Sequence, residues 1–218
     1  MSRKKNVSKH SITEMYMDYY LANNEAPKSV YQFAKLNNFN EKDFYNYFGN
    51  FMAIDQYVFL SFYDQSKTLL EKSEDYNSFD PRNKLLSFYF TFFELLSANR
   101  SFVLLLLKEE YKPWNSMASL SPLKKEYVKF IKDLDIETLD LKEERIEKFQ
   151  EKSIQQSSWM QFLITLNFWV SDVSPSFEKT DVFIEKSINT SFDLLDVKPL
   201  KSIIDLGKFM FHEKIGMN

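Results

Sequence analysis

Residues 29–48, SVYQFAKLNNFNEKDFYNYF, decide the fold that we expect for this chain. Val30 and Phe33 have the spacing of the inward face of a short helix. A polar run at 37–40, NNFN, interrupts this pattern, and Phe44 then begins the apolar face of a second short helix. Two short helices joined by a tight turn predict a helix-turn-helix, in which the second helix is offered to the outside.

Local signals agree with this interpretation. Ser29 and Gln32 form the pattern of a capping box for the first short helix. Asn40 is a favourable cap for the second, with Asp43 one turn further on. Asn38 stands where the turn requires a positive φ, which Asn tolerates better than any other residue except Gly. We therefore expect two capped helices around an Asn turn.

The rest of the chain also reads as helical, because no segment alternates with the period of two that predicts a strand. We expect an all-α protein of about nine or ten helices. A three-helix helix-turn-helix domain would occupy residues 1–55, and a larger helical domain residues 56–218. Besides the two short helices, we expect helices at 11–22, 51–72, 81–96, 101–110, 121–134, 140–170, 180–197 and 198–212.

Several packing expectations follow from periodicity. Ser11 with Glu14 predicts a capping box that opens the first helix, and Asp140 predicts a cap for the helix that ends near Val170. The segment from Leu85 to Leu96 is apolar on nearly all sides, which predicts a central position in the larger domain. The expected helix at 51–72 has an apolar face at Ile54, Val58, Phe62 and Leu69. The expected helix at 140–170 has an apolar face at Trp159, Phe162, Leu163, Leu166, Trp169 and Val170. Met160, Ile164 and Phe168 would widen this second face.

Composition excludes several classes of site. There is no cysteine, so disulfides, thiolate zinc sites and cysteine catalysis are excluded. Only two histidines, His10 and His212, could take part in a metal site or a catalytic triad, and we expect no metal and no cofactor. Glu94, alone in an apolar helix, could be a buried acid, although such a residue more often lies at a helix end or pairs with a neighbour. These observations argue against an enzyme.

Charge and hydropathy suggest a cytoplasmic protein without a membrane span. The net charge is −3, so the chain as a whole is not a polycation. The longest apolar run, Phe102 to Leu107, is far shorter than the ~20 residues that a membrane span requires. The first ten residues contain four cations and no acid, namely Arg3, Lys4, Lys5 and Lys9. This basic tail is either a phosphate-binding arm or an ordinary solubilising terminus.

A three-helix front module, a connector helix and an aromatic-rich helical domain together resemble the TetR family of transcriptional regulators. The residues that carry the resemblance lie between Ile12 and Ile54, above all Ala34 and the block FYNYF at 44–48. The resemblance implies a homodimer whose last two long helices pack against their mates, at 157–170 and at 180–197 or 199–211. It also implies a double-stranded DNA operator and an effector pocket among the central helices.

The resemblance carries particular residues over to the DNA interface. Lys42 would face base edges or phosphates, and Tyr45 would give its hydroxyl to a phosphate. Tyr47 takes the position at which the family usually has His, and Asn40 would cap the reading helix. The full set of expected DNA-binding residues is Lys28, Ser29, Asn40, Lys42, Tyr45, Asn46 and Tyr47.

The chain also departs from the family pattern. Asn38 replaces the common turn Gly, and Phe51 replaces the Lys that usually begins the connector helix and contacts a phosphate. Two residues of the reading helix, Glu41 and Asp43, are acidic, and residues 11–50 carry three lysines against five carboxylates. Because neutralised phosphates supply most of the affinity for DNA, we expect weak or strongly salt-sensitive binding.

Two functions therefore stay open on the sequence. The first is a repressor-like regulator that responds to a small apolar or aromatic ligand. The alternative is a lipid- or isoprenoid-binding accessory protein of the same fold that no longer binds DNA, which would be an analogy to a mitochondrial ubiquinone-biosynthesis protein. For the ligand pocket we expect aromatic walls and one amide: Phe88, Phe92, Trp159, Phe162 and Asn167. The same side chains could equally be core or dimer seam.

Overall fold

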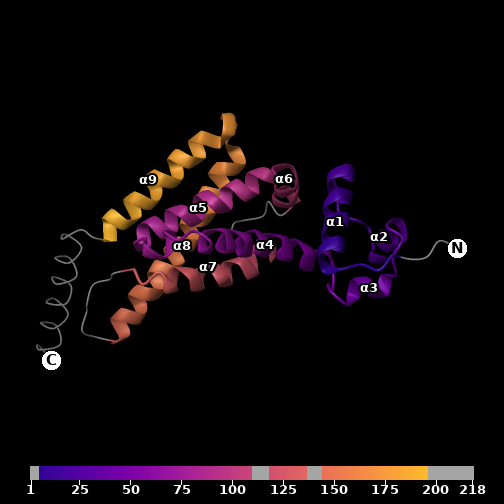
Figure 1. The fold of residues 1–218 in the computed structure, drawn as a ribbon, viewed down its shortest axis with the longest axis horizontal. Helices are drawn as coiled ribbons and strands as arrows, with labels where there is room; N and C mark the ends of the chain where they lie inside the picture. The colour runs from indigo at the N-terminus through magenta and orange to yellow at the C-terminus, as the bar shows by residue number, and fades with distance from the viewer. Residues whose placement is uncertain (1–4, 110–117, 137–143, 196–218) are drawn as a thin grey trace, which may run out of the picture. The chain divides into compact units, whose positions relative to one another are not determined.

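The chain is all-α, as expected. The computed structural model describes residues 5–109, 118–136 and 144–195, and within these ranges it contains nine α-helices, three short 3-10 helices and no strand (Figure 1). The α-helices are α1 Lys9–Asn23, α2 Val30–Leu36, α3 Glu41–Tyr45, α4 Phe51–Glu71, α5 Pro81–Ala98, α6 Arg100–Glu109, α7 Ser121–Asp133, α8 Glu144–Ser171 and α9 Glu178–Leu195. The 3-10 helices are η1 Tyr76–Ser78, η3 Ala118–Leu120 and η4 Pro175–Phe177.

The chain divides into two compact units. The first contains Met1–Ser73 and Thr91–Tyr127, and the second contains Glu74–Phe90 and Val128–Asn218. The first unit thus holds α1 to α4 together with α6 and η3, while α8 and α9 belong to the second. The domain boundary at residue 55 stays a prediction.

Aromatic side chains form the core of the first unit. Phe33 of α2 lies 5.7 Å from Phe51 and 6.4 Å from Phe44 between ring centres. Tyr16 of α1 stacks on Phe51 at 5.4 Å, with only 13° between the ring planes. Phe102 of α6 reaches the same cluster, 6.2 Å from Tyr16. The first three helices are therefore held by rings that each bury a large apolar area.

The connector α4 has Asn50 as its N-cap. The Asn50 side chain accepts a hydrogen bond from the Ala53 N–H at 2.9 Å. The buried face of α4 includes every fourth residue from Ile54 through Val58 to Leu70. Leu69, expected on this face, is 49 % exposed, because it lies about 100° around the helix from Leu70.

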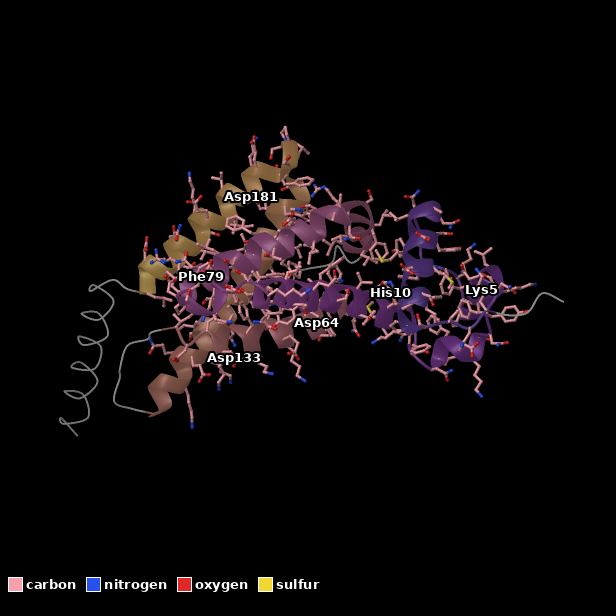
Figure 2. All side chains as sticks on the ribbon, viewed as in Figure 1. Lys5, His10, Asp64, Phe79, Asp133 and Asp181 are labelled. Atoms are coloured by element: carbon pink, nitrogen blue, oxygen red, sulfur yellow. The ribbon has the colours of Figure 1, made fainter. Side chains whose placement is uncertain are left out.

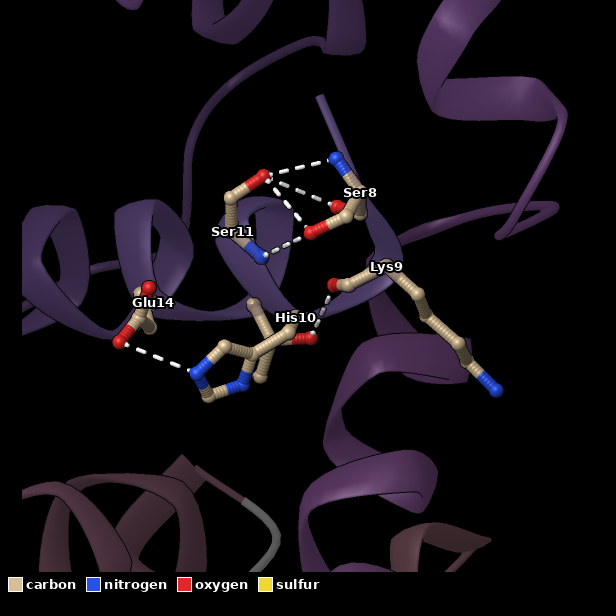
Figure 3. Close-up of polar contacts among 6 residues, drawn as sticks. Ser8, Lys9, His10, Ser11 and Glu14 are labelled. Atoms are coloured by element: carbon tan, nitrogen blue, oxygen red, sulfur yellow. Dashed lines mark hydrogen bonds and ion pairs between the residues drawn. The ribbon is translucent and has the colours of Figure 1, made fainter. Parts of the chain in front are cut away.

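The first helix begins earlier than expected. Ser8, not Ser11, is the N-cap of α1, and Ser11, the third residue of the helix, completes the capping box (Figure 3). The Ser8 hydroxyl accepts from the Ser11 N–H at 3.1 Å, and the Ser11 hydroxyl accepts from the Ser8 N–H at 2.8 Å. Glu14 instead pairs with His10 at 3.3 Å, one turn away. The sequence contains two overlapping capping patterns, and the structure uses the earlier one.

Helix α5 is not buried on all sides. Leu85, Phe88 and Leu96 are buried, but Phe90 is 38 % exposed and Glu94 is exposed. The expectation of a fully surrounded helix was therefore wrong: one stripe of α5 faces solvent. Glu94 lies on that stripe, so it is not a buried acid.

The second unit contains the antiparallel pair α8 and α9. Ile184 and Ile188 of α9 are fully buried, and Phe168 of α8 stacks on Phe183 at 4.5 Å. Gln161 of α8 adds polar contacts: its amide donates to the Ser187 hydroxyl at 3.3 Å, and it accepts from the Ser191 hydroxyl at 3.1 Å. Met160 and Ile164, expected to widen the buried face of α8, are about half exposed.

Some expectations concern residues outside the described ranges. These are the cap at Asp140 and the last helix at 198–212. Among the described helices, none is by itself long and apolar enough to cross a membrane. Only α5 and α6 taken together, across a bend of 92°, have the required length and composition.

Candidate functional site

The turn between α2 and α3 has the expected conformation. Asn38 adopts a φ of 58°, in the left-handed region that Asn tolerates. The next residue, Phe39, donates its backbone N–H to the Ala34 carbonyl at 3.0 Å and is itself buried. Ala34 is buried as well, which allows the two helices to approach closely. The chain therefore builds a helix-turn-helix with Asn at the position that requires positive φ.

The caps of the two short helices are simpler than predicted. The Ser29 hydroxyl accepts from the Gln32 N–H at 3.2 Å, which is one half of a capping box. Asn40 occupies the N-cap position of α3, but its side chain makes no capping hydrogen bond to the backbone. Its amide donates instead to the Asp43 carboxylate at 3.1 Å. The negative charge of Asp43 is thereby engaged within the first turn of α3.

Helix α3 presents a polar and aromatic face to solvent. Phe44 is fully buried, so the residues on the other side of this five-residue helix face outward. Lys42 and Asn46 are exposed, and the Tyr45 side chain is 53 % exposed. The acids Glu41 and Asp43 are only half-exposed. Helix α3 and its C-cap thus expose a lysine, a phenol and an amide.

The other expected DNA-binding residues border this face. Lys28 is exposed and precedes the cap of α2, and Ser29 is half-buried because it forms that cap. Asn40 is exposed at the start of α3. Tyr47 is 44 % exposed, but its hydroxyl donates a hydrogen bond to the Val7 carbonyl at 3.4 Å.

The N-terminal segment packs on the helix-turn-helix, a contact that the sequence did not predict when it left the tail as either a phosphate-binding arm or a solubilising terminus. The Lys5 N–H donates to the Asn38 carbonyl at 2.9 Å, and Val7 is buried. Figure 2 shows Lys5 beside α2 and α3. The signal was Val7, the single apolar residue after Met1 in a polar tail, followed at once by the capping pattern of Ser8 and Ser11. Segment 5–8 therefore belongs to the folded module.

Phe51 packs against the aromatic rings of the first unit. Its ring lies between Tyr16 and Phe44, at 5.4 and 5.5 Å, and is half-buried. The following residue, Met52, is exposed at the start of α4. The site therefore lacks a cation where the family pattern has one, and aromatic packing explains the replacement.

The residues expected to line a ligand pocket are largely buried. Phe88, Phe92 and Phe162 are fully buried or nearly so, Trp159 is buried, and Asn167 is half-buried. The Trp159 and Phe162 rings stack at 5.1 Å, and Phe88 lies 4.9 Å from Phe130. These contacts are also those of an aromatic core, so the pocket assignment stays a prediction.

Helices α8 and α9 form an apolar groove on their outer side. It has a volume of about 720 Å³, and Phe168, Val182 and Phe183 contribute its apolar lining. Lys179 and Lys186 add cations to the groove. Met160 and Ile164 precede Phe168 at intervals of four residues and continue the apolar stripe along α8. Within the described ranges, no group of three His, Asp or Glu side chains is arranged to hold a metal ion.

Comparison with known proteins places the chain in a family. Residues 84–210 match the family model of the tetracyclin repressor-like C-terminal domain. No individual curated protein matches the chain. The match covers more than half of the sequence and lies outside the helix-turn-helix on which the resemblance first rested. It gives no support to the alternative of a lipid-binding accessory protein. The chain belongs to the TetR family of transcriptional regulators.

Proposed function

We propose that the protein is a homodimeric repressor that binds a double-stranded operator through α3 and leaves it when a small apolar or aromatic ligand binds. The observation that carries the proposal is the outward face of α3. Lys42, Tyr45 and Asn46 are exposed while Phe44 anchors the helix from behind. In a helix-turn-helix, side chains of the second helix enter the major groove and meet base edges and phosphates.

The acidic residues of α3 oppose binding less than their number suggests. Asp43 accepts a hydrogen bond from the Asn40 amide and is half-buried, as is Glu41. Lys42, between them in sequence, is exposed. A phosphate approaching this face therefore meets the lysine ammonium more closely than the two carboxylates. Binding of this kind is strongest at low ionic strength.

The apolar surface of α8 and α9 supports a homodimer. Met160, Ile164 and Phe168 form one stripe of α8, and Val182 and Phe183 extend the apolar area onto α9. Contiguous exposed apolar surface of this kind marks an interaction site. The same face of a second copy of the chain would cover this surface in a symmetric dimer. The dimer would then present two α3 helices to two half-sites one DNA turn apart.

The effector would bind among the aromatic side chains of the second unit. Phe88, Trp159 and Phe162 supply apolar walls, and the half-buried Asn167 supplies an amide that could orient a ligand. An apolar or aromatic molecule is the class that such a lining favours.

A mobility-shift assay at low salt, with fragments from upstream of the protein's own gene, tests the DNA-binding proposal. Wild type should retard at least one fragment. Lys42→Ala and Tyr45→Phe should each weaken binding by about tenfold, in line with the loss of one charged or hydrogen-bonded contact.

Lys72→Ala is the matched control, since it removes an exposed cation at the far end of α4. This variant should bind as wild type does. Absence of a retarded fragment with wild type, or equal loss with Lys72→Ala, would count against α3 as the reading element.

A further inference from the structure

We propose that residues Lys5–Lys9 form an N-terminal arm of the DNA-binding module, which places the Lys5 side chain on a DNA phosphate beside the reading helix. The proposal rests on the proposed binding of DNA through α3 and adds a second contact element to it.

The arm is attached to the helix-turn-helix at two places. At its start, the Lys5 N–H donates to the carbonyl of Asn38, the turn residue, at 2.9 Å. Two residues later, the Val7 carbonyl accepts from the Tyr47 hydroxyl at 3.4 Å, and the Val7 side chain is buried. The backbone of the arm thus bridges the turn before α3 and the residues after it.

The end of the arm is also fixed by contacts, at Ser8 and at Lys9. Ser8 and Ser11 exchange two hydrogen bonds that start α1 (Figure 3). The Lys9 ammonium lies 3.9 Å from the centre of the Tyr57 ring and 5.5 Å from that of Phe48. Such cation–π contacts hold a lysine over its aromatic partners. The Lys9 ammonium therefore contacts rings of the protein itself. The Lys5 side chain is the cation of the arm that remains available to DNA.

The attachment point places Lys5 close to where DNA would lie. Asn38 precedes the N-cap of α3 by two residues, and the N-terminal residues of a reading helix are those that meet base edges. The Lys5 side chain is exposed and has a long flexible stem. From this position its ammonium can reach the backbone that flanks the groove.

Lys5 matters for DNA binding because the module has few cations. Between Lys5 and Asn50 the chain carries five lysines and five carboxylates, so each cation is a fifth of the positive charge available. Lys42 is the one lysine of α3, and Phe51 removes the cation expected at the start of α4. An arm lysine compensates for that loss.

The same geometry gives Tyr47 a positioning role. Its hydroxyl donates to the Val7 carbonyl, so the phenol ties the arm to the residues that follow α3. Tyr47 thereby also acts on DNA binding through the placement of Lys5, and its direct contact with DNA stays a prediction.

The arm is tested by measuring the affinity for the operator fragment with fluorescence anisotropy, at salt concentrations between about 50 and 200 mM. Lys5→Ala should reduce the slope of log K against log salt by about 0.9, the value for one phosphate contact, and lower the affinity at each salt concentration. Lys5→Arg keeps the charge and should keep the slope. Lys72→Ala should also keep it.

The outcomes separate this proposal from the one it rests on. If wild type binds no DNA, both are overturned. If wild type binds and Lys42→Ala weakens binding while Lys5→Ala leaves the slope unchanged, the arm alone is overturned.

Amide hydrogen exchange of the free protein tests the attachment without DNA. The Lys5 amide should be protected in wild type, and Tyr47→Phe, which keeps the ring and removes the hydroxyl, should speed its exchange. A Lys5 amide that exchanges at the rate of an unstructured chain in wild type would overturn the arm.

Discussion

Asp172 shows how one side chain organises a connection between helices. One carboxylate oxygen accepts from the Ser174 N–H at 2.8 Å and its hydroxyl at 2.7 Å. The other oxygen accepts from the Thr180 N–H at 2.9 Å and its hydroxyl at 2.7 Å. Burial by itself would raise the pKa of Asp172, but these hydrogen bonds outweigh it and lower the pKa to about 2. The carboxylate ties the end of α8 to the start of α9.

This low pKa predicts an acid-sensitive part of the stability. The folded-state pKa lies below the unfolded one, so the stabilisation is present above about pH 4 and is lost as the pH falls towards 2. We expect a loss of about 2 kcal/mol in the free energy of unfolding across this window, measured by urea denaturation at several pH values.

Asp172→Asn should lose about 2 kcal/mol at neutral pH and lack this part of the pH dependence. Asp193→Asn is the control, because Asp193 is an exposed carboxylate whose bond to Arg82 lies at the surface. An unchanged acid profile in Asp172→Asn would contradict the role of Asp172.

A second prediction concerns the cation missing at the start of α4. Phe51→Lys restores a lysine there but removes a ring stacked on Tyr16, so we expect the free energy of unfolding to fall by about 2 kcal/mol or more. Met52→Lys adds the same charge at an exposed neighbour and should change stability by less than about 0.5 kcal/mol. Urea denaturation of both variants distinguishes them, and equal stabilities would contradict the core role of Phe51.

At the scale of elements, the short helix α3 depends on its surroundings. Helix α3 has five residues, far fewer than the ~12 that an isolated helix needs for marginal stability in water. Its conformation is maintained by Phe44, which packs on Phe33 and Phe51, and by the turn that precedes it. The turn is therefore the natural place to test the element.

Asn38 supplies the third prediction. Its φ of 58° costs an ordinary side chain about 1 kcal/mol, so Asn38→Ala should lower the free energy of unfolding by about that amount. Asn38→Gly should be neutral within about 0.5 kcal/mol. Asn46→Ala is the control, because Asn46 has a φ of −67° and is exposed. Thermal unfolding measures all three, and a harmless Asn38→Ala would contradict the requirement for positive φ.

At the scale of the whole molecule, the prediction concerns assembly. Ile164→Glu places a charge in the apolar stripe of α8, and we expect it to convert a dimer to a monomer, since a buried unpaired carboxylate is costly. Light scattering coupled to size-exclusion chromatography measures the mass. The variant should fold as wild type does, because Ile164 is 49 % exposed within one chain.

Leu69→Glu is a close control, since Leu69 has the same exposed fraction but lies on α4. This variant should keep the mass of wild type. A monomeric wild type, or a dimer that survives Ile164→Glu, would contradict the proposed interface.

The sequence alone determined the all-α class, the helix-turn-helix and its Asn turn, and the cap at Ser29. These features rest on interactions between residues a few positions apart, so local pattern is sufficient to identify them. The start of α1 was missed by two residues because two capping patterns overlap at Ser8 and Ser11, and the structure uses the earlier one.

Tertiary structure decided which apolar residues are core and which remain on the surface. Phe51 stacks on Tyr16 and is half-buried, whereas Met160, Ile164 and Leu69 are exposed, although all four are apolar residues at helical spacing. It also decided that Lys5, Val7 and Tyr47 belong together, with Val7 and Tyr47 separated by 40 positions in sequence. Burial and hydrogen bonding between distant segments depend on how the chain packs, and a periodic pattern contains no information about the partner that a given face will meet.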